Sequence, residues 1–483
     1  MKLKQLLAGV DVIFTSADME MEISNVAYDS RKVMPGDLFV AVAGFASDGN
    51  RFIPMALDKG AVAIVSAKVP STKAPYVQVA SDRLALAQIG ANLYGNPAKS
   101  MKLIGVTGTN GKTSTTLLLK HVLETVLGAK VGLVGTMENY VGDLVIPTER
   151  TTPESLDLQA LFAQMRDAGC GYAIMEVSSH AIALDRVGGL HYDVGAFTNL
   201  TEDHLDFHKT MEEYASVKAK LFQRCEKAVL NGDDAWAKVM AKDATCQILT
   251  TSNKGTADLY AKDAELLSDG VTFTAVYGQE QAKVHLPIPG KFTVYNALSV
   301  LGIALQLGIS LSDAAKALQT AKGVKGRVEV VPTPNKPYTI LIDYAHTPDG
   351  LENVLSSVKG FCKGRLIALF GCGGDRDPIK RPIMGKIGTQ LADIAILTSD
   401  NPRTEEPGAI LEDILKGVDK EKKNYIVLEN RPQAIRYAMD IGQKDDIIVL
   451  AGKGHETYQE ICGVKHHMDE REIVQAYLEE MEN

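Results

Sequence analysis

The fold is decided by one stretch, Lys102-Leu103-Ile104-Gly105-Val106-Thr107-Gly108-Thr109-Asn110-Gly111-Lys112-Thr113. It opens as an apolar strand, turns through glycines and leads into an amphipathic segment that runs to Leu127. A strand that passes through a glycine turn into a helix aims backbone N–H groups and the helix N-terminus at an anion. The stretch therefore predicts a phosphate-binding loop at the edge of a parallel α/β sheet.

Two residues of the loop have a specific expected task. Lys112 would neutralise the β- and γ-phosphates of ATP, and the Thr113 hydroxyl would ligate Mg²⁺. The standard pattern G-x-x-x-x-G-K-[ST] needs glycine where this chain has Val106. An ordinary glycine turn is the alternative, but the strand, loop, Lys-Thr pair and helix together favour nucleotide binding. The expected ATP-binding residues of the loop are Gly108, Thr109, Asn110, Gly111, Lys112 and Thr113.

Short apolar strands alternate with longer amphipathic segments along the whole chain, which predicts the α/β fold class. The 483 residues exceed what one hydrophobic core usually serves. Proline-containing breaks at 96–100 and 331–337 separate three domains, predicted at residues 1–98, 99–328 and 329–483. The central domain would carry the phosphate loop on a parallel sheet, between an N-terminal α/β domain and a C-terminal Rossmann-like domain. Residues 1–14 are expected to form a first amphipathic helix.

The composition argues against several classes of protein. The 51 basic and 60 acidic residues leave a net charge of −9, which disfavours a nucleic-acid binder. No stretch approaches the roughly 20 apolar residues that span a bilayer, and the N-terminus lacks a signal-peptide pattern. Six cysteines lie far apart with no C-x-x-C pair, as expected in a reducing compartment. We expect a cytoplasmic protein that acts on small molecules and has neither nucleic-acid nor membrane partners.

Two further strands are expected to bring metal-binding groups to the phosphate loop. The strand Tyr172 to Glu176 ends in a carboxylate, and the strand Val194 to Thr198 leads to the acidic loop 199–206, which contains His204. Carboxylate oxygens at the carboxyl edge of a parallel sheet suit Mg²⁺. Taken alone, a strand-end glutamate is more often a capping or surface residue, so the prediction depends on the loop upstream.

The last third of the chain predicts a second pocket. The strands Leu366 to Phe370, Ile394 to Thr398 and Ile447 to Ala451 each end in a glycine-rich or polar turn, and such strand ends hold ligands in α/β sheets. Arginines beside an acid suit a substrate end that carries carboxylates and an ammonium. A solvated turn is the plainer alternative for each segment. The expected pocket residues are Arg376, Asp400, Asn401, Pro402, Arg403, Gly452 and Glu456.

Three motifs together resemble the Mur ligases, namely Gly108 to Thr113, Glu176-Val177-Ser178-Ser179-His180 and Asp203-His204-Leu205-Asp206. The resemblance covers the whole chain. It implies an ATP-dependent amide ligase that activates a carboxylate as an acyl phosphate, which an amine then attacks. Asp29-Ser30-Arg31 and the segment 35–41 look like the family's uridine-diphosphate-binding domain. Residues 290–297 are similar to its adenine-side segment, and the resemblance adds Asn296 and Arg327 to the ATP site.

The resemblance also implies roles for other side chains. Lys218 would carry a carbamate, an N6-carboxylysine that helps to bind magnesium; its sequence context alone does not separate it from Lys220. The implied metal ligands are Thr113, Glu176, His204 and carbamylated Lys218, and the implied catalytic residues are Lys112, Glu176, His204 and Lys218. The implied contacts to the nucleotide-sugar peptide are Ser30, Thr151, Thr152, Ser178 and Arg186.

The substrates follow from the resemblance as well. It implies that the γ-carboxylate of D-glutamate in UDP-N-acetylmuramoyl-L-alanyl-D-glutamate is activated. Asp400-Asn401-Pro402-Arg403 matches a segment of the members that add meso-diaminopimelate, whereas lysine-adding members lack this arginine. A monomer is expected. The alternatives are a folylpolyglutamate-synthase-like ligase, an L-lysine-adding ligase and an inactive nucleotide-binding regulator. The N-terminal uridine domain argues against the first of these, and the intact catalytic set against the last.

Overall fold

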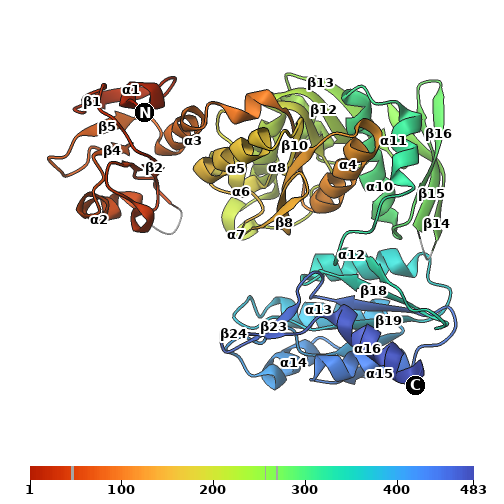
Figure 1. Ribbon diagram of the computed structural model, residues 1–483. Coiled ribbons are helices and arrows are strands. Elements are labelled where there is room, and N and C mark those ends of the chain that lie inside the picture. Colours follow the sequence, from red (N-terminus) through yellow and green to blue (C-terminus); the bar gives the residue numbers. More distant parts are fainter. Residues whose placement is uncertain (45–47, 149, 256, 268–269, 483) are drawn as a thin grey trace. The chain divides into compact units, whose positions relative to one another are not determined.

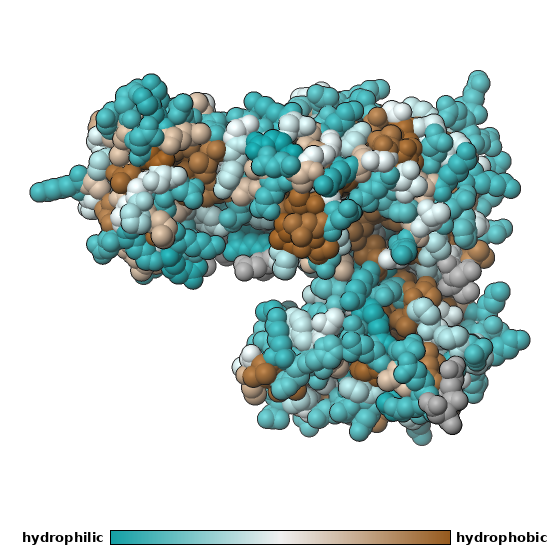
Figure 2. All heavy atoms as spheres, in the orientation of Figure 1, coloured by the Kyte–Doolittle hydropathy of each residue, from teal (hydrophilic) through white to brown (hydrophobic). Residues whose placement is uncertain are grey.

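The structure is a computed structural model that describes residues 1–44, 48–148, 150–255, 257–267 and 270–482 (Figure 1). The side chains of Asp206 and Glu482 lie outside the described set. The chain divides into two compact units, Met1–Thr251 with Ser299–Ser310, and Ser252–Leu298 with Leu311–Asn483. On the face drawn in Figure 2, hydrophilic atoms predominate and apolar patches interrupt them.

The first unit begins with a small sheet in which the strand order is β1-β5-β4-β3-β2. Its strands are β1 (Val12–Thr15), β2 (Val26–Ala27), β3 (Leu38–Val40), β4 (Ala63–Ser66) and β5 (Tyr76–Val79), and its helices are α1 (Leu3–Leu6), α2 (Ile53–Asp58) and α3 (Asp82–Leu93). Among the described strands of this sheet, only β1 runs antiparallel to its neighbour. The predicted helix over residues 1–14 is wrong. The helix α1 ends before Gly9, which has a φ of +74°, and Val12 then starts the strand that pairs with β5.

The phosphate loop follows β6 (Lys102–Thr107), which lies between β10 (Tyr172–Glu176) and β11 (Tyr192–Phe197) and runs parallel to both. The sheet continues in parallel through β7 (Val131–Val134), β12 (Cys225–Asn231) and β13 (Gln247–Ser252), and β8 (Glu138–Val141) and β9 (Leu144–Pro147) add an antiparallel edge. Residues 103–107 are all buried, as expected of a central strand covered on both faces. The covering helices include α4 (Lys112–Leu127), α5 (Ser155–Asp167), α6 (Ser179–Ala183), α7 (Leu205–His208), α8 (Met211–Ala219) and α9 (Ala237–Lys242).

The second unit contains an antiparallel meander and a doubly covered sheet. The meander is β14 (Leu259–Leu267), β15 (Gly270–Tyr277) and β16 (Glu280–Leu286), followed by α10 (Lys291–Gln306), whose last turns belong to the first unit, and α11 (Leu311–Leu318). The sheet has the order β17-β18-β22-β19-β20-β21, with β17 (Glu329–Val331), β18 (Thr339–Asp343), β19 (Leu366–Phe370), β20 (Ile394–Leu397), β21 (Tyr425–Val427) and β22 (Ile447–Ala451). Apart from β17, its strands are parallel.

Two hydrophobic clusters explain why these strands are apolar throughout. Side chains from one face of the sheet pack with α12 (Pro348–Lys359), α13 (Lys380–Leu391) and α14 (Pro407–Leu415), and those from the other face pack with α15 (Arg431–Asp440) and α16 (Glu470–Glu482). Strands buried on both faces lose the polar alternation of surface strands. The strands β20, β19 and β22 are neighbours, so their carboxyl ends lie side by side as predicted. A hairpin, β23 (Tyr458–Ile461) and β24 (Val464–His467), follows them.

Candidate active site

The phosphate loop is shorter than the standard pattern, and the structure gives the reason for Val106. Val106 is fully buried inside β6, paired with Glu176 and Ala196, so the loop starts only after Thr107. Gly108 has a φ of +150°, and a Cβ there would lie 1.9 Å from Thr198 Oγ1, so a side chain at this position is excluded. Helix α4 begins at Lys112, directly behind Gly111.

Two lysine amines meet on one carbonyl oxygen of this loop. Lys112 Nζ and Lys218 Nζ donate to Gly108 O at 3.0 and 2.9 Å, and Lys112 Nζ also donates to Thr109 O at 2.8 Å. Lys218 is 1% exposed. Burial, and then the Lys112 charge, lowers the pKa of Lys218 well below its usual value. A neutral amine is the form that adds CO₂, so the environment of Lys218 fits a carbamate.

Glu176 joins the loop to the strand beside it. Its Oε1 accepts hydrogen bonds from Thr113 Oγ1 and Thr136 N, both at 2.9 Å, and its Oε2 accepts one from Thr136 Oγ1 at 2.9 Å. The side chain is fully buried. A hydroxyl and a carboxylate in contact at a phosphate loop are the hard oxygen donors that Mg²⁺ prefers, so this pair fits the ion.

His204 is exposed. Its backbone is left-handed, with a φ of +54°, and its ring lies edge-on to His180 at 4.8 Å and to Tyr214 at 6.3 Å. Tyr214 in turn places its hydroxyl 3.2 Å from Thr109 Oγ1. Over the described residues, no group of three or more His, Cys, Asp or Glu side chains could hold a metal by itself.

His208 belongs to this cluster, although the sequence did not single it out. It is 1% exposed, its Nε2 lies 2.8 Å from Ser179 Oγ, and its ring stacks on Tyr214 at 5.0 Å. The Tyr214 ring also lies 4.6 Å from Lys218 Nζ. His208 therefore ties the Ser178–His180 segment to the helix that carries Lys218.

We predict that His208→Gln flattens the acid dependence of stability. Burial, aided by His180, lowers the pKa of His208 from 6.5 to about 4, so the folded state keeps the ring neutral while the unfolded chain takes up a proton. His208 thus stabilises the fold fully above pH 6.5, and this contribution of roughly 3 kcal/mol is lost as the pH falls toward 4. Urea midpoints at pH 7 and pH 5 should differ less for the variant than for the wild type. The exposed His191→Gln is the control. If the urea midpoint changes with pH equally in both variants, His208 is not the group that causes the acid dependence of stability.

The expected nucleotide-sugar contacts of the central domain gather around the end of β10. Thr152 Oγ1 donates to Glu176 O at 2.7 Å and lies 3.3 Å from Ser178 Oγ. Thr151 Oγ1 lies within hydrogen-bond distance of Thr136 Oγ1, at 3.1 Å. Arg186 Nη1 donates to Thr152 O at 3.2 Å, and burial lowers the pKa of its guanidinium. These hydroxyls and Arg186 therefore form one continuous polar patch.

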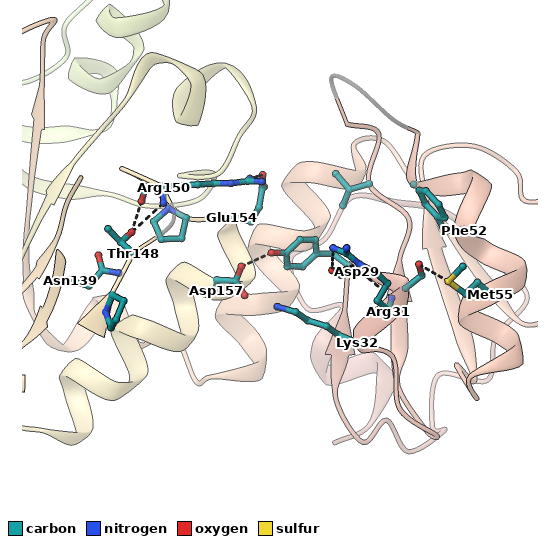
Figure 3. A pocket seen from close by; sticks show the side chains of 16 residues that line it. Asp29, Arg31, Lys32, Phe52, Met55, Asn139, Thr148, Arg150, Glu154 and Asp157 are labelled. Carbon is teal, nitrogen blue, oxygen red and sulfur yellow. Dashed lines mark hydrogen bonds and ion pairs between the residues drawn. The ribbon is translucent and has the colours of Figure 1, made fainter. Parts of the chain in front are cut away.

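A pocket of about 890 Å³ is lined by side chains from two parts of the first unit, residues 28–55 and residues 139–157 (Figure 3). Ser30 lines it, and its Oγ donates to Met55 Sδ at 3.4 Å. Glu154, at the start of α5, forms ion pairs of 2.9 to 3.4 Å with three arginines that sequence reasoning had not grouped around it. These are Arg83, Arg150 and Arg186. Tyr28 Oη donates to Asp157 Oδ2 at 2.5 Å across the same pocket. Three basic side chains line the pocket, Arg31, Lys32 and Arg150, together with three acidic ones, Asp29, Glu154 and Asp157. The basic groups suit a pyrophosphate-bearing ligand, for which the pocket is large enough.

Asn296 and Arg327 belong to the second unit. Asn296 is buried in α10. The Arg327 guanidinium lies 5.1 Å from the centre of the Tyr344 ring, and the adjacent Val328 N donates to the buried Asp343 carboxylate at 2.8 Å. Burial raises the pKa of Asp343. Arg327 is therefore held against the segment that follows β18.

The glycine turn after β19 lies against the loop after β20. A Cβ at Gly374 would lie 1.9 Å from Pro402 O, so only glycine permits this approach. Arg403 Nη1 donates to Gly374 O at 2.7 Å, and its Nε forms an ion pair with Glu460 at 3.3 Å. Arg376 is exposed, and its Cγ and Arg403 Nη1 would both lie within 4 Å of a Cβ at Gly373. The two arginines thus flank one turn.

The acidic groups among these turns are held by hydrogen bonds. Glu456 accepts them from Asn401 Nδ2 at 2.9 Å and Lys453 Nζ at 2.6 Å, and its place beside the arginines stays a prediction. Asp400 Oδ1 accepts one from Asn401 N at 2.7 Å, and its Oδ2 would lie 2.7 Å from a Cβ at Gly452. Asp400 Oδ2 is buried and has no hydrogen-bond partner among the described residues. Lys453 and Glu460 were not predicted as pocket residues.

These features define a class, an α/β enzyme with a phosphate loop, a buried lysine beside it and a group of charged strand-end turns in its second unit. Three family models match the chain in order: the Mur ligase family, catalytic domain, over residues 22–94; the Mur ligase middle domain over 106–304; and the Mur ligase, glutamate ligase domain, over 326–454. The chain belongs to the Mur ligase family. The predicted fold class of three α/β domains is confirmed, while the boundaries at 98 and 328 stay predictions.

Relatives extend over the whole chain. It is 47% identical to the UDP-N-acetylmuramoyl-L-alanyl-D-glutamate--2,6-diaminopimelate ligase of Clostridium tetani and 48% identical to ligase 1 of that name from Clostridium acetobutylicum, with 100% of each chain covered. A solved structure of a ligase with the same name is 32% identical, has a TM-score of 0.74, and is matched over 100% of this chain and 99% of that one. None of the described helices is long and apolar enough to cross a membrane.

Proposed function

We propose that this Mur ligase consumes ATP to join meso-diaminopimelate to the γ-carboxylate of D-glutamate in UDP-N-acetylmuramoyl-L-alanyl-D-glutamate, in the cytoplasm and as a monomer. The names of the full-length relatives support the substrates. The single observation that carries the reaction type is the convergence of Lys112 and Lys218 on Gly108 O beside the Thr113–Glu176 pair. In this cluster Lys112 would neutralise charge on a phosphoryl group in transfer, and Lys218 as a carbamate would join the Thr113–Glu176 pair in holding the metal ion.

The chemistry proceeds in two steps. A γ-carboxylate oxygen attacks the γ-phosphorus of ATP, and ADP leaves with the electron pair of the broken P–O bond. The amine then attacks the acyl phosphate carbon, inorganic phosphate leaves with the C–O electron pair, and the nitrogen loses a proton. No enzyme nucleophile is needed, so the residues act by positioning and by neutralising charge.

The residues in and around the phosphate loop bind either the phosphates of ATP or the metal ion. Lys112 swings from the loop carbonyls to the β- and γ-phosphates, and the N–H groups from Gly108 to Thr113 cradle them. Thr113, Glu176, His204 and carbamylated Lys218 would hold Mg²⁺, which neutralises charge on the transferred phosphate when bound. The resemblance to the Mur ligases implies that Asn296 and Arg327 also bind ATP.

The nucleotide-sugar peptide takes the pocket of the first unit. Arg186 and the hydroxyl groups of the polar patch bind the peptide, and Ser30 binds the uridine diphosphate end. Glu154 positions Arg186 through their ion pair at 2.9 Å. The patch residues are Thr151, Thr152 and Ser178.

The strand-end pocket selects the amino acid. Arg403 and Arg376 bind the distal carboxylate, and Glu456 lies on the side of the ammonium. Lysine ends in an ammonium alone, so it would leave Arg403 without a substrate partner. We expect diaminopimelate to be preferred by about 10²-fold in kcat/KM, because an unmatched charged group in the pocket costs a few kcal/mol.

An amino-acid panel tests the proposal. Phosphate release is measured with ATP and UDP-N-acetylmuramoyl-dipeptide, adding either meso-diaminopimelate or lysine at equal concentration. Turnover that requires all three substrates, with diaminopimelate preferred, supports the proposal. Comparable rates with lysine would indicate the lysine-adding alternative, turnover with a folate and glutamate the folylpolyglutamate-synthase-like one, and ATP binding without turnover the inactive regulator.

A further inference from the structure

Lys453 is a fully buried cation among the strand-end turns to which the proposed function assigns the amino acid. It follows β22 after Gly452 and is 0% exposed. Its Nζ donates to Asn401 Oδ1 at 2.7 Å and to Glu456 Oε2 at 2.6 Å, and lies 5.1 Å from the centre of the Tyr458 ring. Burying an ammonium costs free energy unless the group is paired. The partners of Lys453 must therefore stay at hydrogen-bond distance from it.

Asn401 is oriented by this cation. Its Oδ1 accepts hydrogen bonds from Lys453 Nζ and from Glu460 N, at 2.9 Å, which uses both lone pairs of an amide oxygen. Its Nδ2 donates to Glu456 Oε2 at 2.9 Å. A flipped amide would point N–H groups at the Lys453 ammonium and at the Glu460 N–H. The amide orientation is therefore fixed, and with it the position of the Glu456 carboxylate.

The same network reaches Arg403 through the hairpin. Glu460, whose N–H is held by Asn401, also forms the ion pair with Arg403 Nε. The backbones are joined as well, because Arg403 N donates to Glu460 O at 3.1 Å and Cys462 N donates to Arg403 O at 2.7 Å. Arg403 sits in left-handed backbone, with a φ of +53°, which these contacts hold in place.

We propose that Lys453 is a positioning residue that sets the polarity of the amino-acid pocket, holding Glu456 and, through Asn401 and Glu460, Arg403 at their places. The proposal rests on the proposed function, in which this pocket takes diaminopimelate. Lys453 itself touches no substrate in this scheme. It keeps an acid and a guanidinium at fixed places, so that an ammonium and a carboxylate on one substrate end can be bound together.

The test is Lys453→Met in the full-length enzyme, with Lys465→Met as the matched control. Lys465 also lies over the Tyr458 ring, at 4.2 Å, but it is exposed. For Lys453→Met we expect the KM for diaminopimelate to rise about 30-fold and the preference over lysine to fall about 10-fold, as loss of a buried charged hydrogen bond predicts. The KM for ATP and for the nucleotide-sugar peptide, and kcat at saturation, should stay within about 3-fold, because the network contains none of the residues assigned to phosphoryl transfer. The control should match the wild type.

Each other outcome has a defined meaning. Unchanged diaminopimelate KM and selectivity in Lys453→Met, with a wild type that uses diaminopimelate, overturn the inference alone. A fall in kcat with unchanged KM also overturns it, since that would give Lys453 a chemical role. A wild type that does not use diaminopimelate overturns the proposed function and this inference together. If Lys453→Met does not bind ATP, the variant Asn401→Asp tests the inference in its place. This variant puts an oxygen, which cannot donate, against Glu456 Oε2. An unchanged KM for diaminopimelate in Asn401→Asp would overturn the inference.

Discussion

Arg403→Ala is expected to raise the KM for diaminopimelate by about 10²-fold while the KM for ATP changes little. The variant removes a guanidinium that is 20% exposed and bonded to Gly374 O, and it leaves the distal carboxylate of the substrate without a cation. Loss of a charge-assisted bond together with an unsatisfied charge costs about 3 kcal/mol, which corresponds to that factor. Steady-state kinetics with each substrate varied in turn measures both constants.

Two variants control for this result. Arg436→Ala removes an arginine that pairs with Glu480 at the surface, where its side chain is 40% exposed, and we expect wild-type kinetics from it. Arg403→Lys keeps the charge but not the planar fork, and should lie between the wild type and Arg403→Ala. An unchanged diaminopimelate KM in Arg403→Ala would exclude Arg403 from the pocket.

The fold could be predicted where the residues of a single strand are enough to identify that strand. The strands 172–176, 366–370 and 447–451 were predicted to the residue, because their apolar runs end abruptly in polar or glycine turns. The N-terminal segment failed because a four-residue helix and a four-residue strand share 15 residues, and their apolar positions mimic one amphipathic helix.

Residues of the candidate site could be predicted from the sequence only where they belong to a recognisable motif. Glu176 is the last residue of β10, and Lys112 follows the turn after the neighbouring parallel strand β6, so sheet geometry places both at the same edge of the sheet. His208, Lys453 and Glu460 carry no such signal, because each acts through contacts made from elements far apart in the chain, as with His208 and Ser179 or Lys453 and Asn401. A buried lysine is identified by its burial, and burial is a property of the folded chain.

Lys218→Met is expected to lower kcat by about 10²- to 10³-fold, the usual cost of removing a group that stabilises charge in a transition state. The methionine fills the buried space beside Gly108 but cannot carry a carbamate. ATP should still bind, because Lys112 and the loop N–H groups remain. The wild type in ¹³C-labelled bicarbonate should show a carbamate carbon signal by NMR, and the variant should lack it.

The neighbouring lysine makes this prediction specific. Lys220 lies two residues on and is exposed, so Lys220→Met should keep both the NMR signal and the activity. The distinction is physical: burial and the Lys112 charge lower the pKa of Lys218, so its amine is neutral and reactive toward CO₂ at a pH where an exposed lysine remains protonated. Lowering the pH should therefore remove the carbamate signal as the amine protonates, and activity should fall with it. Full activity in Lys218→Met, or a wild type without the signal, would show that the amine itself, bonded to Gly108 O, is the working form.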